Sequence, residues 1–167
     1  MSDIDHFVVF TLDGKKFALK LNLVERITRA VEITSLPKAP IIILGIINFQ
    51  GRIIPVVDMR KRFNMKSKQL NVEDHFIIGK TSMRSVAIWV DSVLDIIGSP
   101  EEKIIEYDTI LPDMNYVEGI IKYDDEMLLI HDLDKVLLLE DEEKLEEAMM
   151  TFNQSSDPLK QKKQLAK

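Results

Sequence analysis

The side chains that could carry out chemistry are few and widely separated in this chain. The three histidines, His6, His75 and His131, include no pair with the spacing that places two imidazoles on one helical face for zinc. Cysteine is absent, which excludes disulfides, thiolate metal sites, thiol nucleophiles and iron–sulfur clusters. The sequence therefore predicts no metal site and no thiol chemistry.

Other catalytic and ligand-binding patterns are also missing from the sequence. The six glycines form no phosphate-binding loop, and no serine lies in a Gly-x-Ser-x-Gly elbow. The acidic run 124–126 lacks the alternating oxygen ligands and the glycine of a calcium loop. Because triads assemble from distant residues, an enzyme stays an open alternative. We nevertheless predict no catalytic residues and no cofactor.

The composition narrows the class of protein further. The 167 residues include 22 Lys and Arg against 28 Asp and Glu, a net charge of −6, which disfavours a nucleic-acid binder with a basic face. Residues 1–5 are acidic, unlike the start of a secretory signal, and the longest apolar stretch, 41–47, is far shorter than the roughly 20 residues of a membrane span. We therefore expect a cytoplasmic protein that does not insert into membranes.

The elements that must position any site are organised as a tandem repeat. Residues 45–49, GIINF, resemble residues 119–123, GIIKY, 74 positions later, and earlier segments align at a spacing of 69. Chance similarity between β-rich segments is the alternative. The sequence predicts one domain over 4–140, made of two units at about 6–63 and 75–137.

Each unit has the pattern of β-hairpins followed by a short capped turn. Asp13-Gly14 is a type I′ turn signal, and Gln50-Gly51 and residues 124–126 separate two further strand pairs. Asp58 and Asp132 each close a last strand, where helix capping is favoured over catalysis. The sequence therefore predicts a mainly all-β fold.

A helix follows the second unit. Leu145, Met149 and Phe152 recur at intervals of four and three, which predicts a helix over 141–153 that docks on the strands through this stripe. Residues 154–167 are polar and basic and predict a frayed tail, with a regulatory or partner-binding role as the alternative.

Three segments, 24–27, 36–40 and 44–60, resemble the CheW family of chemotaxis coupling proteins. Residues 45–60, GIINFQGRIIPVVDMR, match the usual family run Gly-Val-x-Asn-Leu-Arg-Gly-x-x-x-Pro-Val-Val-Asp-Leu-Arg, and the resemblance extends over about 7–139. It implies two packed five-stranded SH3-like β-barrels, between which strands can be exchanged, plus the C-terminal helix. A boundary near residue 70 therefore stays open. With no kinase or receiver domain in this sequence, the resemblance is to a stand-alone coupler.

The resemblance implies a scaffold that binds two partners at the membrane arrays. These partners are the histidine kinase CheA, through its CheW-like regulatory domain, and the cytoplasmic tip of chemoreceptors. By position in the matching segments, the receptor groove would include Val24, Arg26, Ile27 and Gln50. Further partner contacts, or their support, would come from Gly45, Asn48, Gly51, Val93 and Ile96.

Two positions depart from the family pattern. Arg26 stands where glutamate is usual, and Gln50 stands where arginine is usual, so the ion pair of the family would become a weaker Arg26–Gln50 contact. The change suggests a groove tuned to a variant partner or a divergent non-flagellar pathway. Neutral drift at a solvated pair is the alternative. A small-ligand sensor built on the same barrels is a further alternative function.

Overall fold

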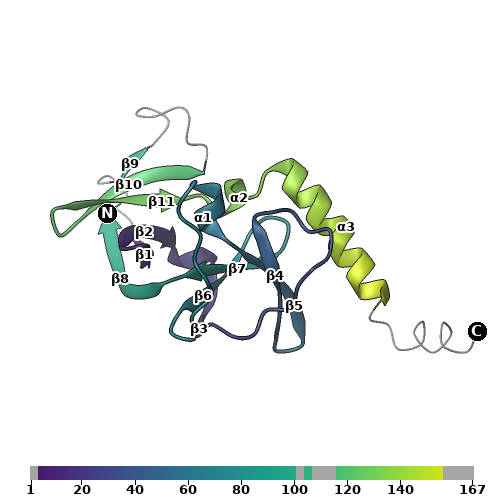
Figure 1. Ribbon diagram of the computed structural model, residues 1–167. Helices are drawn as coiled ribbons and strands as arrows, with labels where there is room; N and C mark the ends of the chain where they lie inside the picture. The colour runs from purple at the N-terminus through teal and green to yellow at the C-terminus, as the bar shows by residue number, and fades with distance from the viewer. Residues whose placement is uncertain (1–3, 101–103, 107–115, 156–167) are drawn as a thin grey trace, which may run out of the picture.

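The strands of this protein form two sheets, with a helix along one side (Figure 1). The computed structural model describes residues 4–100, 104–106 and 116–155. One sheet has the order β8-β1-β2-β11-β10-β9, and the other has the order β3-β6-β7-β5-β4. Their strands are β1 (Ile4–Leu12), β2 (Lys15–Lys20), β3 (Val24–Arg29), β4 (Ile43–Phe49), β5 (Arg52–Val57), β6 (His75–Lys80), β7 (Ser85–Val90), β8 (Ser92–Pro100), β9 (Ile105–Glu106), β10 (Val117–Tyr123) and β11 (Glu126–His131).

The predicted fold class is confirmed: the described chain is mainly β, with two packed sheets and a C-terminal helix. One sheet has six strands rather than the five expected, because the two-residue strand β9 is added beside β10. The remaining helical segments are the 3-10 turn η1 (Leu21–Leu23), α1 (Met59–Arg62), α2 (Leu133–Val136) and α3 (Leu139–Ser155).

The two sheets do not coincide with the two sequence units at 6–63 and 75–137. Strands β1 and β2 join β8–β11, whereas β6 and β7 join β3–β5. The exchange is symmetric, because β2 runs parallel to β11 through Ala18 and Ile130, and β7 runs parallel to β5 through Ala87 and Val56. These two pairs occupy equivalent positions in the repeat. Each unit therefore completes the sheet of the other.

The predicted hairpin turns are confirmed by the backbone. Asp13 and Gly14 have φ values of 52° and 76°, and Gln50 and Gly51 have 51° and 83°. Two consecutive residues with positive φ define the type I′ turn, whose twist matches that of the flanking strands. Asp58 and Asp132 cap α1 and α2, where their carboxylates accept hydrogen bonds from the amides two residues further on.

The main hydrophobic core lies between the sheets and under the helices. It combines Phe10 and Leu19 of one sheet with Ile77 and Ile88 of the other. The stripe predicted for the C-terminal helix is confirmed, since Leu145 is fully buried there and Met149 and Phe152 pack against the same cluster. Helix α3 extends two residues beyond the predicted 141–153 at each end. The predicted tail therefore begins inside the helix, and residues 156–167 lie outside the described residues.

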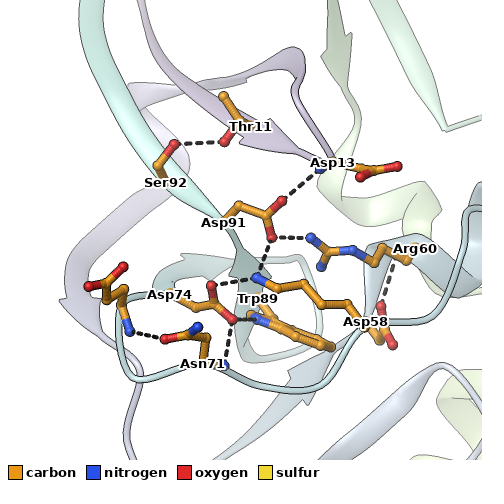
Figure 2. Close-up of polar contacts among 11 residues, drawn as sticks. Thr11, Asp13, Asp58, Arg60, Asn71, Asp74, Trp89, Asp91 and Ser92 are labelled. Carbon is orange, nitrogen blue, oxygen red and sulfur yellow. Dashed lines mark hydrogen bonds and ion pairs between the residues drawn. The ribbon is translucent and has the colours of Figure 1, made fainter.

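A polar network joins the sheets at the end of β7 (Figure 2). The carboxylate of Asp91 accepts a hydrogen bond of 2.7 Å from the backbone amide of Asp13 in the β1–β2 turn. The same carboxylate pairs with the guanidinium of Arg60 from α1 and lies 3.1 Å from Lys68 Nζ. Burial by itself raises the pKa of Asp91, but the Asp13 amide, Arg60 and Lys68 together hold that pKa below its ordinary value. One carboxylate thus ties the β1–β2 turn to the five-stranded sheet.

Arg60 and Trp89 extend this network into the core. The Arg60 side chain is 1% exposed, and its guanidinium lies 4.9 Å from the centre of the Trp89 ring. The indole Nε1 of Trp89 donates to the buried carboxylate of Asp74 at 2.9 Å. Lys68 Nζ lies 2.6 Å from that carboxylate, and the network thereby pairs its buried charges.

His131 forms a second unusual feature of the core. It is 1% exposed, and neither of its ring nitrogens has a hydrogen-bond partner within the described ranges. Its ring packs against those of Phe17, Phe63 and Tyr116 at centroid distances of 4.8, 4.7 and 6.2 Å. Burial lowers the pKa of His131 to about 3, so the imidazole is neutral and acts as an aromatic packing group.

We predict that Asp91→Asn destabilises the protein by about 3 kcal/mol, because the buried Arg60 guanidinium loses its carboxylate. Urea unfolding followed through Trp89, the single tryptophan, measures the change. The matched control is Asp125→Asn, because the Asp125 side chain is 99% exposed and its replacement should change stability by less than about 0.5 kcal/mol. Equal effects of the two substitutions would contradict the role given to Asp91.

We predict that His131 makes stability fall with acid. Its pKa drops from 6.5 in the unfolded chain to about 3 in the folded one, so between these values the unfolded state binds the extra proton. The free energy of unfolding is therefore unaffected by His131 protonation above about pH 6.5. Below that pH, it falls by about 1.4 kcal/mol per pH unit until about pH 3. Between pH 7 and pH 5, the wild type should lose about 2 kcal/mol more than His131→Phe in urea unfolding. Parallel losses would refute this assignment.

Candidate functional site

Strand β3 lies at one end of the five-stranded sheet, and the β4–β5 hairpin lies at the other end. The sheet curls, which brings these two ends together. The Arg26 guanidinium of β3 lies 5.6 Å from the centre of the Phe49 ring of β4. Thr34, beyond the end of β3, exchanges two backbone hydrogen bonds of 2.8 Å with Ile46 of β4. These contacts close the barrel and place the sequence-predicted residues of both segments on one side of the molecule. We call this region, β3 together with the β4–β5 turn, the β3/β4–β5 face.

An ion pair fixes the β3/β4–β5 face. Glu25 Oε2 lies 2.7 Å from Arg52 Nη2, and Glu25 Oε1 accepts a hydrogen bond of 2.5 Å from the Ser85 hydroxyl. The Ser85 hydroxyl and, after it, the Arg52 guanidinium hold the pKa of Glu25 below its ordinary value. Three strands, β3, β5 and β7, thereby meet at one carboxylate.

The expected Arg26–Gln50 contact does not form in the described structure. Both side chains are exposed, and no hydrogen bond or ion pair joins them. The reason is a β-bulge, since the register of β3 against β6 shifts between Val24 and Arg26 and leaves Glu25 as the extra residue. A bulge re-aims the side chain it carries. Glu25 is therefore the residue paired with the hairpin, and Arg26 stacks on Phe49 instead.

The other predicted residues of β3 and of the β4–β5 hairpin pack against the core or close the hairpin turn. Val24 and Ile27 are half-buried and pack against the main core. The Asn48 side-chain oxygen accepts a hydrogen bond of 3.0 Å from the amide of Gly51, which closes the turn around Gln50. These contacts hold the two exposed side chains, Arg26 and Gln50, on a fixed backbone.

Gly45 is buried and leaves no space for a side chain. A Cβ placed there would lie 2.4 Å from the carbonyl oxygen of Thr34 and 2.5 Å from a methyl carbon of Ile33. The close approach of these two segments is the same contact that closes the barrel at Ile46. Gly45 therefore supports the backbone of the β3/β4–β5 face.

Val93 and Ile96 lie on β8, in the six-stranded sheet. Val93 pairs with Phe10 and is half-buried against the main core, whereas Ile96 pairs with Val8 and is 52% exposed. The structure thus places the predicted residues on two separate sheets. Of the two, Ile96 is the residue that exposes apolar surface.

Sequence reasoning missed the roles of Glu25, Arg52 and Ser85. Glu25 and Arg52 lie within the matching segments, but the bulge that orients Glu25 has no sequence signal. Ser85 is 60 residues from Glu25, and their contact depends on the strand order β3-β6-β7-β5.

Among the described residues, this face presents the Arg26 guanidinium without an ion-pair partner, the exposed amide of Gln50 and the carboxylate of Glu25, which is paired with Arg52. Within the described ranges, no three His, Asp or Glu side chains gather in a way that could hold a metal ion. None of the helices in this part of the chain has the length and apolar composition needed to cross a bilayer.

Comparison with known proteins gives consistent matches over most of the chain. A family model described as "CheW-like domain" matches residues 6–141. The chemotaxis protein CheW of Rhizobium meliloti is 28% identical over 138 residues, covering 81% of this chain and 89% of the relative. The chemotaxis protein CheW of Bacillus subtilis is 30% identical over 139 residues, covering 80% and 86%.

A solved structure agrees with the sequence matches. The scaffolding protein TtCheW from Thermoanaerobacter tengcongensis superposes with a TM-score of 0.74 at 32% identity, covering 84% of this chain and 91% of the other. With a family model that spans residues 6–141 and a matching solved fold, this chain belongs to the CheW family of chemotaxis scaffold proteins.

Proposed function

We propose that this protein couples chemoreceptors to the histidine kinase CheA, acting in the cytoplasm as a non-catalytic scaffold. The proposal rests on the β3/β4–β5 face. There, the side chains of Arg26 and Gln50 are exposed, and the Glu25–Arg52 ion pair fixes the backbone that bears them. This face coincides with the segments through which the sequence resembles the family's receptor groove.

Rigidity is what a coupler of this kind requires. A scaffold transmits a conformational change of one partner to another only if its two binding surfaces keep a fixed position relative to each other. Here, the Asp91 network and the shared core would hold that position, because they join the β1–β2 turn and the five-stranded sheet through buried contacts. A receptor held on one surface and a kinase held on another would then be mechanically linked.

The proposed contacts divide between the two sheets. Arg26 and Gln50 face the receptor tip, with Val24 and Ile27 as the apolar floor beside them. Ile96, supported by Val93, offers a second contact on β8. Gly45, Asn48 and Gly51 act by holding the backbone of the hairpin.

The charge at position 26 predicts the chemistry of the receptor side chain. Arg26 has no carboxylate partner within the described ranges, whereas Glu25 beside it is already paired with Arg52. An exposed guanidinium favours a carboxylate, with which it can form two parallel hydrogen bonds. We infer that the cognate receptor tip, or its kinase counterpart, places an acidic residue here.

We predict that the chain binds both partners in separate titrations. The probes are the CheW-like regulatory domain of CheA and a receptor-tip fragment from the same organism, with expected Kd values of tens of micromolar or tighter, roughly −6 kcal/mol or stronger. Isothermal titration calorimetry measures both. If neither probe binds in this range, the coupling proposal fails whatever the fold.

We predict that Arg26 and Gln50 act together on the receptor fragment. Arg26→Glu should weaken binding, because its carboxylate would repel the acidic residue inferred for the partner. Gln50→Arg should restore part of that affinity, so the double variant should deviate from additivity by about 0.5–1 kcal/mol if both positions meet the same partner residue. The matched control is Lys122→Glu with Asp124→Arg, at the equivalent β10–β11 turn, where Asp124 also has a positive φ of 45°. Strict additivity of the two substitutions would contradict joint action of positions 26 and 50 on the receptor fragment.

A further inference from the structure

The outer side of α3 carries an apolar groove with an acidic rim. A groove of about 570 Å³ is lined by Met83, from the β6–β7 turn, and by Leu139 and Met150 of α3, together with glutamates of the same helix. The three apolar side chains are 66%, 76% and 55% exposed. Clustered exposed apolar side chains of this kind mark a surface that something covers.

The acidic rim is only partly neutralised. Arg84, beside Met83, pairs with Glu142 at 3.3 Å and also pairs with Glu146. Glu143 and Glu147 also line the groove, are exposed, and have no ion pair within the described ranges. An occupant should therefore combine apolar side chains with positive charge.

Residues 156–167 of the same chain have that combination. They contain four lysines and one aspartate, and two leucines, Leu159 and Leu165, flank three of the lysines. The segment follows directly on α3, whose last residue is Ser155. Residues 156–167 thus begin next to the groove, and their leucines and lysines complement its apolar lining and acidic rim.

The lengths are compatible with a chain that folds back along α3. Leu139 and Met150 are separated by about 16 Å along the helix axis at 1.5 Å per residue. Leu159 and Leu165 are separated by about 20 Å when extended, and their even spacing places both on one side of the chain. The four residues from 155 to 159 reach about 13 Å, enough to return from Ser155 to Met150.

We propose that residues 156–167 dock in this groove, with Leu159 near Met150, Leu165 near Leu139 and Met83, and the lysines beside Glu143 and Glu147. Attachment to α3 gives the segment a high effective concentration at the groove, so weak contacts suffice. The docked segment would cover the β6–β7 turn, whose next residue, Ser85, binds Glu25 of the β3/β4–β5 face. The proposal does not depend on the receptor-coupling function.

A spin-label experiment tests this docking in the full chain. Because the chain has no cysteine, Ala166→Cys supplies a single site for a nitroxide label. The ε-methyl signals of labelled methionines then report proximity. We expect selective loss of the Met83 and Met150 signals, with no loss for Met127, which is 74% exposed on β11 and serves as the internal control.

Charge reversal tests the role of the rim. Glu143→Lys combined with Glu147→Lys should restore most of the Met83 and Met150 signal, whereas Glu32→Lys, at another exposed site, should not. Equal signal at all three methionines overturns the proposal, as does selective loss that persists in the Glu143/Glu147 double variant. Signal loss that grows with protein concentration assigns the groove to a second copy and likewise overturns docking within one chain.

Discussion

The contact between the Asp91 carboxylate and the buried Arg60 guanidinium is the constraint on which the relation of the two sheets depends. Asp91 follows β7 of one sheet and accepts the Asp13 amide of the turn between β1 and β2 of the other. A buried guanidinium is costly without a carboxylate, so each partner fixes the position of the other. Trp89 and Asp74 complete the surroundings, since the indole lies under Arg60 and donates to Asp74. The sheets are thus joined by directional polar contacts as well as by the shared apolar core.

The surface where partners are proposed to bind depends on a second set of contacts, within the five-stranded sheet. The five-stranded sheet curls until Thr34 reaches Ile46, which requires the absence of a side chain at Gly45. The β3 bulge then aims Glu25 at Arg52 and Ser85, while Arg26 and Gln50 are left exposed. Charge and shape at this face therefore follow from backbone features beneath it. Exposed side chains at this face can therefore be exchanged without disturbing the backbone beneath them.

Local patterns of the sequence were sufficient for most of the individual elements. Turn residues with positive φ, such as Gly14 and Gly51, identified hairpins because few other residues adopt that conformation without strain. The spacing of Leu145, Met149 and Phe152 identified the docking face of α3. Local patterns did not show which strands belong to which sheet. Parallel pairing of β2 with β11 joins residues more than one hundred positions apart, and no local pattern records it.

The sequence by itself determined the all-β class, the hairpins, the C-terminal helix and the resemblance to CheW proteins, since each of these depends on residue types at short spacing. Only the tertiary structure decided how strands are shared between the sheets, that Glu25 rather than Arg26 pairs with the hairpin, and that His131 is a neutral core residue. The physical reason is the same in each case. Pairing, bulges and burial depend on which segments become neighbours, and the energies that choose neighbours act between residues far apart in the chain.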